Sequence, residues 1–341
     1  MSMKMSKPLN AENFLLMLIV FLLAQPFLLA QIDLTSAAIV TREGELSSAE
    51  RSAASILEEE VESRTGIRWS RTTDWPADGP VVVVAARSGS AALARELPIP
   101  AGTESAEIEP EGYRILIEGE SGPAPIAWVI GADPRGALYG VGRLLRLLEL
   151  RKGSILLSEP VDMASSPAYP IRGHQLGFRD KANSWDAWDA EQYEQYIREL
   201  AIFGLNSVEN IPFQDERQSP LMKMSREEAN RTISEICARY GLDYWVWTPA
   251  DFDLRDTVLR GQMLEKHAAL YRNSDRLNGV FFPGGDPGHN PPELVLPFLE
   301  DVAARLLAVH PQARVWLSLQ WFSAEQIDTI YAYLDREQPD W

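Results

Sequence analysis

The chain has 341 residues, 45% of them hydrophobic and 24% charged, which is typical of a globular protein with room for two domains. Its formal net charge of −17 argues against binding of nucleic acid or an anionic membrane surface, because long-range repulsion would oppose both. A neutral or cationic partner fits better, although one well-placed arginine can still bind an anionic group.

The N-terminus has the order of charge and hydrophobicity found in secretory signals. Two lysines precede an apolar block over residues 14–24, and a break at Gln25-Pro26 is followed by the small residue Ala30. The apolar block is shorter than a typical transmembrane helix and is interrupted at Gln25-Pro26. We therefore expect a signal peptide over residues 1–30 and a secreted or periplasmic protein without stable membrane association after cleavage. A retained N-terminal anchor is the alternative.

Cysteine and histidine usage predicts neither a disulfide nor a metal site. Cys237 is the single cysteine, so no internal disulfide can form. The four histidines are scattered and have no zinc-ligand spacing. We therefore expect no metal and no cofactor, and the sequence leaves the oligomeric state open.

Residues 31–159 alternate between strand and helix patterns. Strands are predicted at 37–40, 81–85, 113–117 and 127–131, and helices at 47–61 and 137–150. This is the size and pattern of one small α/β domain. Residues 160–169 are rich in proline, serine and alanine and are predicted to form a linker.

A strand followed by a helix then recurs about every 35 residues, the length of a βα unit. The predicted strands are 171–177, 205–211, 242–247, 279–285 and 313–320, and the helices 189–203, 225–240, 257–272, 292–310 and 323–335. No dinucleotide-type glycine fingerprint appears, which favours a (β/α)₈ TIM barrel over a doubly wound sheet. Only five units are present, so we expect residues 170–341 to be a partial barrel of a longer protein or of a truncated gene product.

The fourth of these strands ends in a conspicuous polar loop. An apolar run from Val280 stops in Gly284, Gly285, Asp286 and, shortly after, His289. Barrel enzymes hold their acids at the carboxyl ends of strands, where glycine lets the backbone approach a ligand. A tight turn with a solvated aspartate is the alternative interpretation.

The predicted strand ends together offer acids, amides and tryptophans. In chain order they carry Gln175, Arg179, Glu209, Asn210, Trp247, Asp251, Asp286, His289, Gln320 and Trp321. Amides and acids match sugar hydroxyls and indole faces match pyranose rings, so this set predicts a carbohydrate site. Alternation points Trp245 and Trp316 away from the mouth, which favours core packing for both.

Two segments carry a resemblance to known families. The run that begins Glu111-Gly112-Tyr113 and continues through residues 131–148 resembles the small α/β domain before the barrel in glycoside hydrolase family 20 β-N-acetylhexosaminidases; family 67 α-glucuronidases carry a related domain. The following Arg172-Gly173 pair resembles the first barrel strand of family 20, which implies that Arg172 grips sugar hydroxyls. A salt-bridged structural arginine is the alternative.

The resemblance is incomplete at the fourth strand. Gly284, Gly285 and Asp286 match family 20, but Pro287 stands where that family has its general acid glutamate. We therefore expect an exported glycoside hydrolase that acts on a terminal sugar of a polysaccharide or glycan, with Asp286 and Glu209 as its carboxyls. Asp251 is a reserve acid, and the other strand-end residues with Arg172 would contact sugar. A non-catalytic carbohydrate-binding protein and an inactive fragment of a longer glycosidase are the alternatives.

Overall fold

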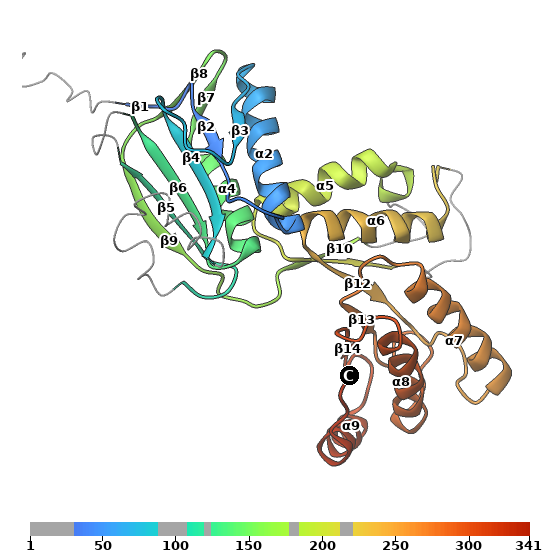
Figure 1. The fold of residues 1–341 in the computed structure, drawn as a ribbon. Helices are drawn as coiled ribbons and strands as arrows, with labels where there is room; N and C mark the ends of the chain where they lie inside the picture. The colour runs from blue at the N-terminus through green and yellow to red at the C-terminus, as the bar shows by residue number, and fades with distance from the viewer. Residues whose placement is uncertain (1–30, 88–107, 119–123, 177–183, 212–220) are drawn as a thin grey trace, which may run out of the picture.

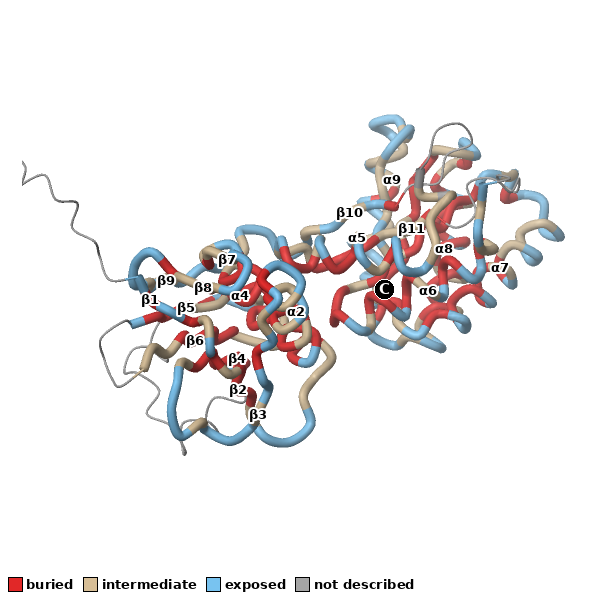
Figure 2. The backbone as a smooth tube through the Cα atoms, turned by 90° about the horizontal axis from the view of Figure 1, so that it is seen from above, coloured by how far each residue is buried: buried red, intermediate tan, exposed pale blue. Residues whose placement is uncertain are grey.

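The computed structural model describes residues 31–87, 108–118, 124–176, 184–211 and 221–341. These residues form two lobes, visible in Figures 1 and 2. The N-terminal lobe contains a six-stranded and a three-stranded sheet, and the C-terminal lobe contains a five-stranded sheet.

The six-stranded sheet has the order β3-β2-β4-β6-β5-β9, in which β3, β2, β4 and β6 are parallel and β5 is antiparallel to both of its neighbours, β6 and β9. Its strands are β2 (Ala38–Val40), β3 (Ser70–Thr72), β4 (Val81–Ala86), β5 (Tyr113–Glu118), β6 (Ile126–Gly131) and β9 (Val161–Ser165). The antiparallel second sheet consists of β1 (Ile32–Asp33), β8 (Ser154–Leu157) and β7 (Glu149–Arg151). Residues 161–165, expected within a linker, are therefore an edge strand paired to β5.

Two helices, α2 (Ser48–Thr65) and α4 (Pro134–Leu147), pack on one face of this sheet. Ser47 begins α2 with a complete capping box, which satisfies two backbone donors at the helix start. Asp133 caps α4 by accepting a hydrogen bond from the Gly136 N–H. Both starts are set by local sequence, and the apolar sides of the helices complete the core of this lobe.

The C-terminal lobe repeats strand and helix, as the sequence predicts. Its elements are β10 (Gly173–Leu176), η1 (Ser184–Ala187), α5 (Ala190–Ile202), β11 (Ser207–Asn210), α6 (Arg226–Tyr240), β12 (Asp243–Trp247), α7 (Thr257–Arg272), β13 (Gly279–Phe282), α8 (Pro292–Leu307), β14 (Arg314–Leu317) and α9 (Ala324–Glu337). All neighbouring strands are parallel and follow chain order. The expected α/β class is confirmed, but the described strands form an open sheet and no closed barrel.

Side chains of alternate strand residues divide the sheet into two faces. His174 contacts Tyr196 of α5, and Phe282 packs against Phe298 of α8, so this face is covered by helices. Glu209 and the residues in register with it lie on the opposite face. That opposite face, called here the concave face, carries the candidate site.

The two lobes meet through helices, since α4 packs on α5 and α2 on α6. The approach is close: a Cβ at Gly142 of α4 would lie 2.1 Å from the Ile202 carbonyl oxygen of α5. The Tyr139 hydroxyl also donates to the Leu205 carbonyl (3.1 Å), and the Ser52 hydroxyl donates to the Arg239 carbonyl (2.8 Å). A shared helical layer therefore joins the lobes.

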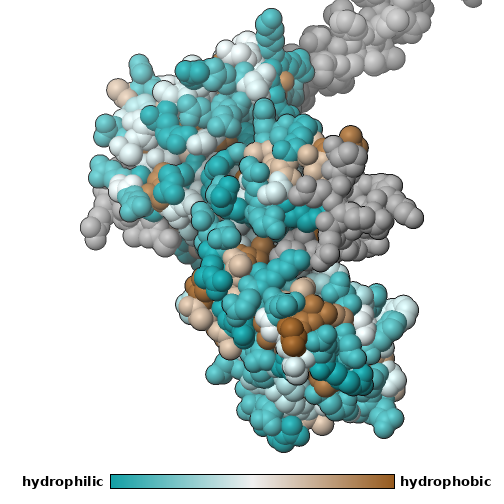
Figure 3. Space-filling model, turned by 90° about the vertical axis from the view of Figure 1, so that its right-hand side faces the viewer, coloured by the Kyte–Doolittle hydropathy of each residue, from teal (hydrophilic) through white to brown (hydrophobic). Residues whose placement is uncertain are grey.

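The surface is mostly hydrophilic in the view of Figure 3, and apolar residues gather there only in small patches. This agrees with the large negative net charge. In the described part of the chain, no helix has the length and hydrophobicity needed to cross a membrane.

Candidate functional site

The concave face holds a row of side chains that the strand register brings together. Gln175 of β10 pairs with Glu209 of β11, Glu209 with Trp245 of β12, and Trp245 with Gly279 of β13. A cavity of about 270 Å³ lies over this row and is lined by Gln175, Glu209, Trp245, Phe281 and Trp316, among others. A carboxyl, an amide and aromatic rings thus share one hollow.

Glu209 has an unusual electrostatic environment for an acid. Burial raises its pKa to about 7, although a hydrogen bond from Gln175 acts in the opposite direction. Its Oε1 atom is buried and has no hydrogen-bond partner among the described residues. A carboxyl with such a pKa holds its proton for part of the time near neutral pH, as a general acid requires.

Trp245 and Trp316 form the aromatic wall of this cavity. Their ring centroids are 6.4 Å apart with an interplanar angle of 77°, and Trp316 is 49% exposed. The expectation that both point away from the site into a core is therefore wrong. Trp245 and Trp247 are two residues apart in β12, and side chains alternate between the faces of a strand, so both lie on the same face of the sheet.

A second group of predicted residues gathers beyond the carboxyl ends of β13 and β14. Gln320 donates a hydrogen bond to the Asp286 carboxylate (2.7 Å), and the His289 ring stacks on Trp321 with centroids 4.9 Å apart. Gly284 permits the close approach of the two loops, because its φ is +79° and a Cβ there would lie 2.4 Å from the Ser318 carbonyl oxygen.

This loop cluster adjoins the cavity along the chain. Phe281 and Trp316, which line the cavity, lie on the two strands that lead into the loops of Asp286 and Gln320. The described structure therefore unites four strand-end residues, Asp286, His289, Gln320 and Trp321, above the strands that wall the Glu209 cavity.

Asn290 was not singled out from the sequence, yet it fixes the neighbouring loop. Its buried amide donates to the carbonyls of Ala250 (3.1 Å) and Phe252 (2.8 Å) and accepts from the Leu254 N–H (3.0 Å). It thereby ties the loop after β12, where Asp251 lies exposed, to the loop of Asp286. No sequence signal marks this role, because the partners are about forty residues away.

Arg172 lies elsewhere than the family resemblance implies. It precedes β10, at the amino ends of the strands, and its guanidinium donates to the Glu111 carboxylate (2.5 Å) and to the carbonyls of Gly204 and Tyr169 (2.8 Å each). Asp286 is at the opposite, carboxyl end of the sheet. The arrangement favours the structural arginine over a sugar-gripping one.

The remaining predicted residues differ in position. Asn210 faces the helices, where its amide donates to Asn230 of α6 (2.5 Å), so it does not lie with Glu209 on the concave face. Trp247 is on the concave face but only 8% exposed. Arg179 lies outside the described residues.

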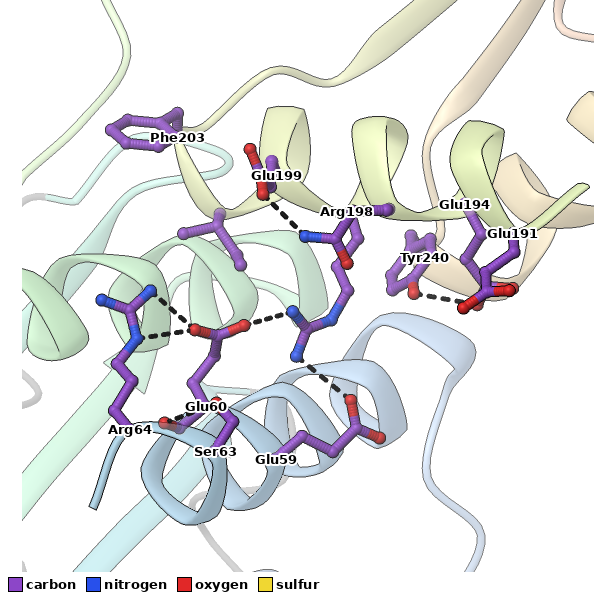
Figure 4. A pocket seen from close by; sticks show the side chains of 12 residues that line it. Glu59, Glu60, Ser63, Arg64, Glu191, Glu194, Arg198, Glu199, Phe203 and Tyr240 are labelled. Carbon is purple, nitrogen blue, oxygen red and sulfur yellow. Dashed lines mark hydrogen bonds and ion pairs between the residues drawn. The ribbon is translucent and has the colours of Figure 1, made fainter. Parts of the chain in front are cut away.

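A larger groove of about 700 Å³ runs between α2, α5 and α6 (Figure 4). Two of its carboxylates pair with arginines there: Glu60 bonds both Arg64 and Arg198, and Arg198 also bonds Glu59. Burial raises the pKa of Glu60, but the hydrogen bonds from the two arginines outweigh it and hold that pKa below its usual range. We interpret this groove as part of the contact between the lobes. No group of three or more metal-ligating side chains occurs among the described residues.

Part of the sequence resembles a glycoside hydrolase domain, and the fold resembles that of solved glycosidases. Residues 27–159 match the family model described as glycosyl hydrolase family 20, domain 2. The N-terminal lobe thus resembles family 20, as the sequence motifs indicate. No curated protein sequence matches the chain.

Solved structures share the fold across both lobes. CpGH84B gives a TM-score of 0.59 at 14% identity, covering 86% of this chain and 48% of its own. A mutant Streptomyces plicatus β-hexosaminidase, solved with its product GlcNAc, gives a TM-score of 0.59 at 13% sequence identity. The match covers 90% of this chain and 70% of the hexosaminidase. The family GH115 4-O-methyl-α-glucuronidase BtGH115A gives a TM-score of 0.59 at 12% sequence identity. The match covers 89% of this chain and 44% of the glucuronidase. The chain therefore spans about half the length of the first and third.

Proposed function

We propose that this protein is an exported glycoside hydrolase that acts on a terminal sugar of a polysaccharide or glycan. The family 20 domain match and the glycosidase fold support the class. The observation that carries the proposal is Glu209, a carboxyl with its pKa raised to about 7 in a cavity walled by Trp245, Phe281 and Trp316. Aromatic walls suit pyranose faces, and the acid suits proton donation.

In the proposed reaction Glu209 gives its proton to the glycosidic oxygen as the bond to the anomeric carbon breaks. The Asp286 carboxylate, oriented by Gln320, stabilises the positive charge that develops on the sugar. Water then adds its hydroxyl group to the anomeric carbon and gives its proton to the Glu209 carboxylate, which restores the acid. Glycosidases normally divide these tasks between two carboxyls that flank the bond. This assignment gives the general acid a position other than the family 20 one, where Pro287 stands.

We also propose that the five βα units belong to a (β/α)₈ barrel. The consecutive parallel order of β10 to β14 and the helices on one face support this. In the described residues β10 and β14 each have a neighbour on one side only, and barrels remove such edges by closure. A closed barrel would place the concave face at its centre.

The decisive experiment is an assay of aryl glycosides of N-acetylglucosamine and of glucuronic-acid-capped xylo-oligosaccharides, with the wild type and Glu209→Gln. Turnover by the wild type and its loss in the variant would support the proposal. Turnover that is unchanged in Glu209→Gln would remove Glu209 from the mechanism.

One observation favours a second function, that of a carbohydrate-binding protein without catalysis. Pro287 cannot donate a proton at the position where the family 20 acid belongs, while the exposed Trp316 and Trp321 could still stack on sugars. Calorimetry with the same oligosaccharides separates the two functions. Binding without turnover of any of them would support the binding protein.

A further inference from the structure

Glu111, in the N-terminal lobe, forms a polar hub at the amino ends of β10 and β11. Its carboxylate accepts hydrogen bonds from Arg172 (2.5 Å), from Arg135 of α4 (2.7 Å) and from the Asn206 amide (3.0 and 3.2 Å). The Glu111 side chain is only 15% exposed. Charge-assisted bonds in so enclosed a place hold their partners in one geometry.

The backbone at Glu111 indicates that this placement is enforced. Its φ is +62°, in the left-handed region that glycine or asparagine adopts more readily. The Glu111 N–H donates to the Asp133 carboxylate (2.7 Å), and Asp133 also caps α4. A glutamate persists in such a conformation when surrounding contacts fix it, and strain of this kind clusters at sites with a role.

The two strand partners of Glu111 also bind each other. The Arg172 N–H donates to the Asn206 side chain (2.8 Å), and the Asn206 N–H donates to the Arg172 carbonyl (2.9 Å). Arg172 and Asn206 directly precede Gly173 and Ser207, the first residue pair in the β10–β11 register. Glu111 therefore bridges the residues that begin the β10–β11 register.

The same strand register also positions Glu209, the candidate acid, relative to Gln175. Three residues after Arg172 and Asn206, Gln175 lies opposite Glu209 and bonds its carboxyl. A shift of one residue would turn Gln175 to the other face of the sheet. Among the described residues that line the cavity, His174 is the only titratable one besides Glu209, and its ring contacts Tyr196 on the helical face.

We propose that Glu111 is a positioning residue that acts from the N-terminal lobe through Arg172 and Asn206 to hold Gln175 against Glu209. The importance of this for catalysis rests on the proposed function, but the positioning itself does not. It predicts that weakening of the hub releases Gln175 from Glu209 while the chain remains folded.

The test is the titration midpoint of Glu209 in the full chain, measured by NMR of glutamate labelled with carbon-13 at Cδ. The resonance is assigned by its loss in Glu209→Gln. The variants are Glu111→Asp, which keeps the charge but shortens the reach, and Glu111→Ala. Glu109→Ala is the matched control, because it removes an exposed carboxylate two residues away.

Both Glu111 variants should shift the midpoint of Glu209 upward, because the bond from Gln175 favours the charged carboxylate. Removal of a negative charge alone would shift it downward, so the sign separates lost positioning from a charge effect. If Glu111→Ala fails to fold, Glu111→Asp carries the test. An unchanged or lowered midpoint in folded Glu111→Asp would overturn the proposal. An upward shift in a protein without glycosidase activity would uphold the positioning and refute only the proposed function.

Discussion

The indole ring of Trp245 lies directly over Gly279 on the adjacent strand. A Cβ built at Gly279 would be 2.3 Å from Cζ3 of the ring, closer than any real contact. The glycine therefore leaves the space that the Trp245 ring occupies beside Trp316. The shape of the Glu209 cavity therefore depends on the absence of a side chain at Gly279.

Gly279→Ala should consequently destabilise the protein by about 1–3 kcal/mol, the usual cost of overpacking, and displace Trp245. Thermal unfolding and tryptophan fluorescence would measure both effects. Gly261→Ala is the matched control: this exposed position of α7 has nothing within 4 Å of a new Cβ, and alanine there should stabilise the helix by roughly 0.5–1 kcal/mol. Equal stability of the two variants would contradict the packing described here.

Glu209 should make stability depend on pH in an unusual direction. Its pKa is raised from 4.5 to about 7 on folding, so its favourable contribution is complete below pH 4.5 and is lost as the pH rises through 7. Glu209→Gln cannot ionise and should be more stable than the wild type at pH 8, by up to about 3 kcal/mol, with little difference at pH 4. Urea unfolding at the two pH values tests this, with Glu109→Gln as the exposed control. A stability difference that does not change with pH would refute the raised pKa.

Asp286→Asn should lower kcat by roughly 10²-fold or more on any glycoside that the wild type hydrolyses, the scale for loss of a positioned catalytic carboxyl. Gln320→Ala should have a smaller effect of the same kind, because it frees the Asp286 side chain. Thermal stability should change little in either case. Asp335→Asn, at an exposed position of α9, controls for charge. Full activity of Asp286→Asn would exclude the residue from catalysis.

His267 should contribute to acid denaturation. It is fully buried on α7, and burial, with a smaller effect from Lys266, lowers its pKa from 6.5 to about 4. The unfolded chain therefore binds a proton first, and stability should be lost as the pH falls from 6.5 towards 4, by up to about 3 kcal/mol. His267→Gln should flatten that part of the pH profile, whereas His289→Gln, at an exposed position, should not. Identical profiles for all three proteins would show that His267 carries no such effect.

We propose that the mature protein begins near Gln31. Intact-mass spectrometry of the protein from its native host should then show the loss of about the first thirty residues, as expected for signal cleavage. Recovery of an intact Met1 terminus in the membrane fraction would instead establish the retained anchor.

The helices were predictable because their signals are local. Ser47, Asp133 and Ser225 each cap a helix within the few residues that follow. β9 was missed, because Val161–Ser165 has little apolar alternation and is held as a strand by its pairing with β5.

The site was less predictable, because its contacts join distant residues. The partner of Arg172 is Glu111, 61 positions earlier, and no local pattern distinguishes a sugar-binding arginine from one in an ion pair. The sequence did predict that Asp286 and Gln320 lie near each other, and the two side chains are hydrogen-bonded. This was predictable because the loops that follow adjacent parallel strands lie at the same edge of a sheet.

The close contact at Gly142 has a consequence for movement. With the backbones of α4 and α5 touching there, and with Arg198 bonded across to α2, a hinge motion would have to separate packed helices and strip buried charges of their partners. We therefore expect the angle between the lobes to stay constant when a ligand enters or leaves the concave face.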